Sequence, residues 1–384
     1  MDMNEIWLFI VAVVFVCING LTMLAWAAAQ GYKMKPTAFA FLVGAVGNLL
    51  TGSITPISGQ SSILTVSHHI KNINERMTAL LLAVIVMVPL GLTGAVTTIA
   101  AFAGPAVVLG MMAGVGLMLT GISFNMINQA KRTGIIAFLS AIITFVLVRV
   151  PAGPHALVYV IAISVTLATL DFVFLQKKRI NIAELAAASG YTGDLSQNDS
   201  PKFWTKEYWS DFKVLSPKFT ISVLLFALAF ICLNIGTNIA FGNITAGFAG
   251  ATQDMNHLTV INALADIPSV IFGGAPVGAI ISATAAAPWP VLAGVVMMLL
   301  CALLLLLGLM TKAVKYIPVQ SIAGFLFIIG FFSTFIPNLR NAFATGNTAE
   351  ASIAMAVTAL TKNPFLGLAS GIGVRYIGAY FGIA

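Results

Sequence analysis

Long apolar runs separated by short polar stretches make up most of the chain. Crossing a bilayer takes about 20 mostly apolar residues. Seven runs are close to or above this length, at about 5–29, 75–101, 134–149, 154–175, 218–243, 289–311 and 318–337. Five shorter or more polar runs lie near 36–52, 103–123, 257–272, 348–361 and 364–383. The pattern predicts twelve membrane-spanning helices.

Two further stretches are rich in Gly, Pro and Ser and are too interrupted to form ordinary spanning helices. They cover residues 52–62, around Pro56, and 272–282, around Pro276. Pro and Gly at this density break a helix and leave backbone N–H and C=O groups without helical partners. Inside a bilayer such backbone survives only where protein buries it or where it lines a cavity. Both stretches are therefore candidate binding sites.

An internal repeat relates the two halves of the chain. Three landmarks recur in order with nearly equal offsets: Asn19 with Asn234 (234 − 19 = 215), Pro56 with Pro276 (276 − 56 = 220) and Pro105 with Pro318 (318 − 105 = 213). With the two broken stretches, the segments divide into seven plus seven. Because seven is odd, the second half must be inverted relative to the first, as in many transporters. We expect a first repeat over 1–176, a connecting loop over 177–217 and a second repeat over 218–384.

The composition indicates a multi-pass membrane protein. Hydrophobic residues make up 59% of the 384 residues and charged residues only 8%, against about 25% charged in an average soluble domain. Too little polar surface remains to cover a water-soluble globule, and a disordered chain would need low hydrophobicity. The net charge of +7 comes from basic residues placed singly or in threes between apolar runs, which is not the layout of a nucleic-acid-binding surface.

The basic residues also predict an orientation. If all fourteen segments cross the membrane, one side receives almost all Lys and Arg, including those of the 177–217 loop, and the other essentially Arg149 and Arg340. The positive-inside rule then places the basic loops in the cytoplasm and both termini outside.

Polar groups inside the apolar segments are the candidates for binding. In the first break these are Ser58, Gly59, Gln60 and Ser61, and in the second Pro276, Val277 and Gly278. The Gln60 amide can donate and accept at once. Asn19, Asn234 and Thr237 either contact a substrate or hydrogen-bond between helices. Asp266 is an intramembrane acid ten residues before Pro276, and such carboxylates are functional candidates because burying them is costly; it is the candidate for ion or proton coupling.

Other chemistries lack a sequence signature. The three cysteines, Cys17, Cys232 and Cys301, lie inside apolar segments, and their odd number argues for small core residues over a disulfide framework or a metal site. Neither a phosphate-binding motif nor a nucleophile–base arrangement is present in the sequence. We therefore expect neither an enzyme nor a cofactor.

The order of these features resembles the nucleobase:cation symporters of the xanthine/uracil permease group, in particular the guanine–hypoxanthine and azaguanine branch. The resemblance rests on Asn19, residues 42–47, Thr55 and Pro56, and residues 233–237, 273–276 and 317–318. It implies an all-α membrane fold of about fourteen segments in two inverted seven-segment repeats, with a core and a gate domain. It also implies short strands in the third and tenth segments, a substrate held between them, and a homodimer.

Two positions depart from that family. Its acidic residues in the eighth and tenth segments fall at Leu233 and Ser282 here, and in the family those carboxylates bind the nucleobase and take part in proton coupling. By this alignment Ser282 joins the candidates for substrate binding. The missing carboxylates favour an alternative, an anion or carboxylate transporter similar to the sulfate permeases or benzoate transporters, which share the fold.

Together these features predict a secondary active transporter in the inner cell membrane, surrounded by lipid. It would move a small planar substrate, in the first instance a purine or pyrimidine nucleobase, by alternating access. Coupling to H⁺ or Na⁺ is expected, and nucleic acid is not a partner. The alternative substrate is an anion or a carboxylate.

Overall fold

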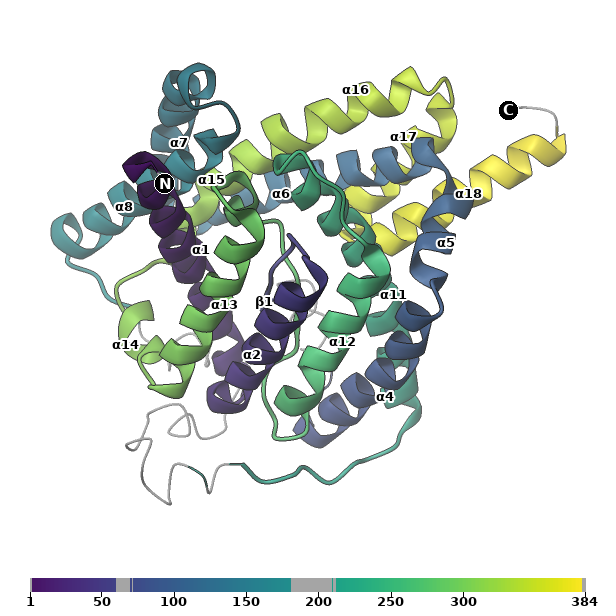
Figure 1. The fold of residues 1–384 in the computed structure, drawn as a ribbon, viewed down its shortest axis with the longest axis horizontal. Coiled ribbons are helices and arrows are strands. Elements are labelled where there is room, and N and C mark those ends of the chain that lie inside the picture. Colours follow the sequence, from purple (N-terminus) through teal and green to yellow (C-terminus); the bar gives the residue numbers. More distant parts are fainter. Residues whose placement is uncertain (1, 60–69, 71, 181–208, 210–211, 382–384) are drawn as a thin grey trace.

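The computed structural model describes residues 2–59, 70, 72–180, 209 and 212–381, most of which are helical (Figure 1). The α-helices are α1 (Met3–Ala29), α2 (Met34–Thr51), α4 (Ile73–Leu92), α5 (Ala95–Ala103), α6 (Pro105–Gln129), α7 (Lys131–Ala152), α8 (Ala156–Leu170), α11 (Ile221–Phe248), α12 (Met255–Val270), α13 (Pro290–Leu306), α14 (Met310–Val314), α15 (Ala323–Phe327), α16 (Ile336–Ala344), α17 (Thr348–Thr361) and α18 (Pro364–Phe381). Short 3-10 or π-helical turns are η1 (Gly153–His155), η2 (Asp171–Leu175), η4 (Ala283–Ala286), η5 (Val319–Ile322) and η6 (Ile328–Phe335), and the strands are β1 (Ile57–Gly59) and β2 (Val277–Ala279).

Many of these helices suit a membrane by length and composition. Six described segments of at least 18 residues are apolar enough to cross one: Met3–Ala29, Ile73–Leu92, Pro105–Gln129, Lys131–Leu175, Ile221–Phe248 and Val319–Ala344. Their surfaces carry large apolar side chains such as Val150 and Ile221, which are 90% and 78% exposed. An apolar surface of this kind suits contact with lipid. The chain is therefore a multi-pass membrane protein.

The predicted span over 75–101 is divided in the structure. The hydropathy predicts a single helix over 75–101, but α4 ends at Leu92 and α5 begins only at Ala95. Gly94 turns the chain with a φ of +78°, a conformation that glycine adopts without steric cost. The Thr93 hydroxyl donates to the carbonyl of Pro89 at 2.8 Å and closes the last turn of α4. Hydropathy does not detect this break because the residues on both sides are apolar.

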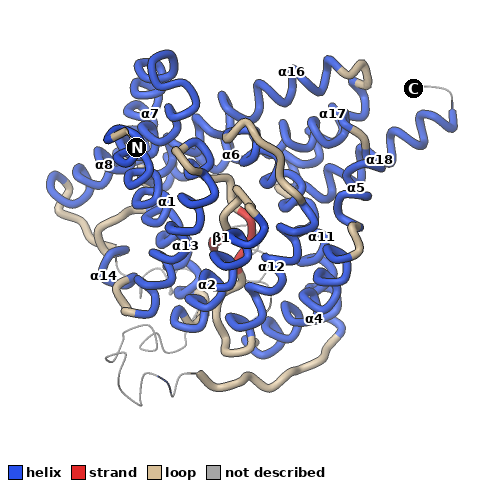
Figure 2. The backbone as a smooth tube through the Cα atoms, viewed as in Figure 1, coloured by secondary structure: helices blue, strands red, loops and turns tan. Residues whose placement is uncertain are grey.

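The two broken stretches form a short antiparallel strand pair in the middle of the fold (Figure 2). β1 follows Pro56 directly and β2 follows Pro276 directly. Ser58 lies opposite Gly278, with Ile57 opposite Ala279 and Gly59 opposite Val277. The offset of 220 that relates the two prolines (276 − 56) also relates Ser58 to Gly278 (278 − 58). The twofold axis that relates the two repeats therefore passes through the centre of the strand pair, as inverted repeats require.

The helices pack as two groups, and each group takes helices from both halves of the chain. One group surrounds the strands and contains α1, α2, α4, α11, α12 and α13; the other contains α6, α7, α8, α15, α16, α17 and α18. Contacts between the groups include α1 with α8 and α11 with α18, where Gly236 lets the backbone at Phe365 approach closely. This arrangement confirms the predicted fold class, two inverted repeats with a strand in each broken segment.

Candidate functional site

Ser58 lies at the centre of β1, directly against α1. A Cβ atom on Gly20 of α1 would lie 2.8 Å from the Ser58 Oγ, so the helix reaches the strand only because residue 20 lacks a side chain. Ser58 is 1% exposed, and within the described residues its hydroxyl has no hydrogen-bond partner. A buried hydroxyl without a partner costs free energy. Ser58 is therefore a polar group at the strand pair that a ligand could satisfy.

The segment that leads into β1 is held by a residue from the other half of the chain. The Gln253 side-chain oxygen, between α11 and α12, accepts from the backbone N–H groups of Ile54 (2.9 Å) and Thr55 (3.3 Å). On the other side, the Asn48 amide of α2 donates to the Thr55 carbonyl at 2.9 Å. The sequence offered no signal for Gln253, which lies about 200 residues from its partners.

The segment that leads into β2 is anchored by α12 and α2. Asp266 accepts from the backbone N–H of Val277 at 2.8 Å, and the Ser269 hydroxyl donates to the Ala275 carbonyl at 2.7 Å. The Thr37 hydroxyl of α2 accepts from the Ala275 N–H at 2.8 Å. These side chains take the place of the helical partners that Pro276 and the glycines remove.

Three of the candidate residues make local hydrogen bonds. The Ser282 hydroxyl caps η4 through Thr284, at 3.1 Å from its N–H. The Asn234 amide donates to the Phe230 carbonyl of its own helix (3.1 Å), and Thr237 donates to the Asn234 carbonyl (3.2 Å). Asn19 lies next to Gly20 and is partly buried. Their binding roles stay predictions, as does that of Gly59, which packs on Leu24. Gln60 and Ser61 lie outside the described residues.

A buried polar network links α11 to α12 one turn before Asp266. The Asn238 amide donates to the Thr259 hydroxyl at 3.0 Å, and the Asn262 amide donates to the Asn238 side-chain oxygen at 2.6 Å. All three residues are at most 1% exposed. Asn262 and Asp266 are four residues apart on α12 and so share a face of the helix. The network therefore fixes the helix that carries Asp266.

Basic side chains gather where α1 ends and α2 begins. Lys33 forms a parallel bridge with Gly274, and its backbone N–H donates to the Gly273 carbonyl at 2.9 Å. Lys35 and Arg76 are 3% and 4% exposed. The Arg76 guanidinium donates to two backbone carbonyls, of Gln30 (3.0 Å) and of Ile70 (2.7 Å), and lies 5.1 Å from the Tyr32 ring centre. In the described part of the chain no carboxylate pairs with Arg76. The sequence placed no cation in either break, but the fold brings Lys33 to the start of the second.

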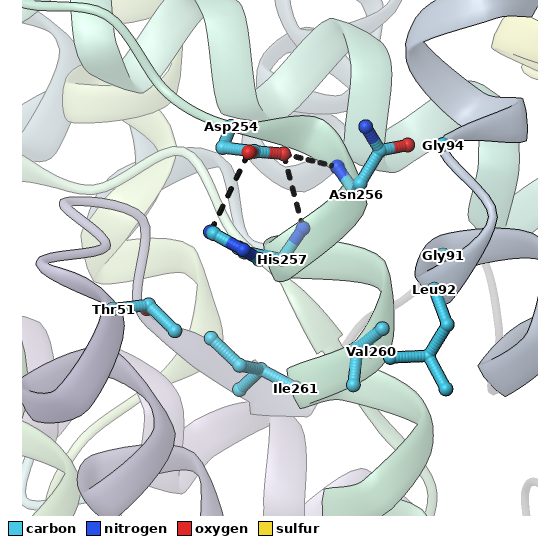
Figure 3. Close-up of a pocket in the computed structure, with 9 residues that line it drawn as sticks. All are labelled: Thr51, Gly91, Leu92, Gly94, Asp254, Asn256, His257, Val260 and Ile261. Carbon is cyan, nitrogen blue, oxygen red and sulfur yellow. Dashed lines mark hydrogen bonds and ion pairs between the residues drawn. The ribbon is translucent and has the colours of Figure 1, made fainter.

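A cavity of about 260 Å³ lies away from the strands, between α2, α4 and α12 (Figure 3). Its wall includes Asp254, whose carboxylate accepts from the N–H groups of Asn256 (2.8 Å) and His257 (3.1 Å) and so caps α12. The Asp254 carboxylate also lies 3.4 Å from the His257 ring. These contacts stabilise the start of α12. The strand pair is a better candidate for a binding site than this cavity, because both repeats contribute to the strand pair equally.

The antiparallel strand pair takes one strand from each of the two inverted repeats. Among solved structures, the chain is similar to the transmembrane domain of the bicarbonate transporter BicA of a cyanobacterium, with a TM-score of 0.55 and 14% identity over 96% of this chain and 98% of that one. It is also similar to SLC26A9, with a TM-score of 0.48 and 13% identity over 99% of this chain and 66% of that one. No protein-family model matches the sequence, and no curated protein matches it. The similarity to the BicA domain confirms the fold.

Proposed function

We propose that the protein is a secondary active transporter of a small anion, which binds between the Pro56 and Pro276 breaks. The observation that carries this proposal is the shared fold with a bicarbonate transporter domain along almost the whole chain. Bicarbonate is therefore the first substrate to test. Alternating access would move one helix group against the other, across contacts such as that of Gly236 with Phe365.

The charges around the strands support an anion over a nucleobase. A nucleobase bound as in the resembled symporters needs carboxylates at positions that hold Leu233 and Ser282, and Leu233 is buried while the Ser282 hydroxyl caps η4. Lys33 lies instead at the start of the second break. The Ser58 hydroxyl adds a hydrogen-bond donor at the centre.

The remaining features of the transporter follow the sequence predictions. We place it in the inner cell membrane, with repeats over 1–176 and 218–384 joined by the 177–217 loop, most of which lies outside the described residues. Homodimer formation and coupling to H⁺ or Na⁺ belong to the same proposal.

Uptake into liposomes tests the proposal. Purified protein is reconstituted, and uptake of labelled bicarbonate, sulfate, benzoate, uracil and xanthine is measured with and without Na⁺ and pH gradients. We expect saturable uptake of an anion, weakened at least several-fold in Ser58→Ala. Ser140→Ala is the matched control, because Ser140 is buried in α7 and bonds only within its own helix. Uptake of a nucleobase alone would contradict the anion assignment, and uptake of none of the five would contradict transport.

A further inference from the structure

Two of the three cysteines lie face to face in the group of helices around the strands. The Sγ of Cys17 in α1 is 3.2 Å from the Sγ of Cys301 in α13. The two side chains are 1% and 0% exposed, although they lie 284 residues apart in the sequence. Met297, one turn earlier on α13, has its Sδ 3.7 Å from the Cys301 Sγ. The fold therefore brings two cysteines from distant apolar segments together as a buried dithiol.

We propose that Cys17 and Cys301 are a redox modification site, which a peroxide converts reversibly into a disulfide bond. A disulfide needs about 2.05 Å between the sulfurs, so closing it moves them together by only about 1 Å. The Met297 side chain is unbranched and flexible, so it can adjust to that movement. Cys232 on α11 is a separate, partly buried thiol.

The reaction balances with hydrogen peroxide as the oxidant. One thiol loses its proton and attacks a peroxide oxygen, the O–O bond breaks, and a sulfenic acid and one water form. The second thiol attacks the sulfenic sulfur, the S–O bond breaks, and a second water leaves with the proton of that thiol. The two sulfurs give up two electrons to the peroxide. Because both sulfurs are buried, the reaction requires local separation of α1 and α13, which a small neutral oxidant can exploit.

The disulfide would tie α1 to α13 beside the strand pair. Gly20 follows Cys17 by about one helical turn, and a Cβ on Gly20 would lie 3.9 Å from the Cys301 Sγ and 2.8 Å from the Ser58 Oγ. The two thiols, Gly20 and Ser58 therefore lie next to one another where α13, α1 and β1 pack together. The modification goes beyond the transport proposal and does not depend on it.

Thiol counting on the full-length protein tests the proposal. Folded protein in detergent is treated with hydrogen peroxide, denatured, alkylated with N-ethylmaleimide and weighed by mass spectrometry. Of the three cysteines, we expect two to escape alkylation, with a peptide that links residue 17 to residue 301 after digestion, and dithiothreitol to restore all three. Cys232→Ala should still form the bond, whereas Cys17→Ala and Cys301→Ala should not.

Two results would overturn the proposal. One is three alkylated thiols after peroxide treatment that does not unfold the protein. The other is a cross-link that includes Cys232 or joins two chains. Gel filtration of each variant before oxidation shows that it is folded, so that a missing bond reports on the cysteine pair and not on misfolding.

Discussion

Single residues position the strand pair, and Asp266 shows how their roles can be separated. The sequence predicts ion coupling for this carboxylate, and the structure gives it a hydrogen bond to the N–H of Val277, the first residue of β2. To hold β2 in place through the Val277 N–H, residue 266 needs only an acceptor oxygen. Coupling to H⁺ needs a group that can bind and release a proton. Asparagine keeps an acceptor oxygen and has no titratable proton.

We expect Asp266→Asn to retain a thermal midpoint close to that of the parent protein. Asp266→Ala leaves the buried Val277 N–H without a partner, which costs about 1–3 kcal/mol, so its midpoint should fall. Thermal unfolding of both variants in the same detergent checks this. Equal destabilisation by the two substitutions would contradict a positioning role, and a loss of pH-dependent uptake in Asp266→Asn with its thermal midpoint retained would favour coupling.

The residues of the site were only partly predictable from the sequence. Ser58 stood out because it lies in a helix-breaking stretch, and the structure places it at the centre of the strand pair. The sequence contained no signal for Gln253 and Lys33, because each contacts a segment that lies some 200 residues away or more. Asn234 and Thr237 could not be assigned, since a polar group in an apolar helix gives the same pattern whether it bonds to its own helix or to a ligand.

Among the elements, α1 depends on Gly20 to reach β1. Ala at this position would place a Cβ 2.8 Å from the Ser58 Oγ, and overpacking of this kind typically costs about 1–3 kcal/mol. We expect Gly20→Ala to lower the thermal midpoint and the added Ser58→Ala to recover part of the loss. Gly121→Ala is the control, since among the described residues no atom beyond its chain neighbours and its own helix backbone lies within 4 Å of its Cβ position. Equal effects of the two single substitutions would contradict direct packing of α1 on the strand.

The contact between α11 and α12 depends on Asn238, which both donates to Thr259 and accepts from Asn262. Interhelical polar contacts in membranes contribute about 0.6–2 kcal/mol. We expect Asn238→Ala to destabilise the protein by an amount in this range, measured by thermal unfolding. Asn243→Ala, on the same helix, removes only a bond to the Ile239 carbonyl of its own helix and should have a smaller effect. The reverse order would show that the network does not hold the two helices together.

Helices were more predictable than their interruptions. Apolar runs of bilayer length predicted most spans, and Pro with Gly predicted both strand-forming breaks. The turn at Thr93 and Gly94 was missed because it divides an apolar run without a change in hydropathy. The strand register could not be read from either segment alone, because the partner of Ser58 lies in the other repeat.

For the whole molecule, the repeat in the sequence predicted the fold, and the contacts show which segments lie next to several of the basic residues. Lys33 lies beside Gly273, the Ile180 N–H donates to the Lys315 carbonyl at 2.8 Å, and the Lys218 N–H donates to Thr78 at 2.9 Å. Arg132 pairs with Asp171 at 2.7 Å near the end of α8. We expect these connections, distant in sequence, to form one basic end of the molecule, and the positive-inside rule predicts that such an end lies in the cytoplasm.

Labelling in intact cells tests this orientation. In a variant without native cysteines (Cys17→Ala, Cys232→Ala and Cys301→Ala), Lys315→Cys marks the basic end, and Asn347→Cys marks the exposed turn between α16 and α17. An odd number of crossings, the single segment from η5 through α16, separates the two positions, so they must respond oppositely. We expect a membrane-impermeant maleimide to label residue 347 in intact cells and residue 315 only after permeabilisation. The opposite result would place both termini in the cytoplasm and show that the charge of the loops does not set the topology of this chain.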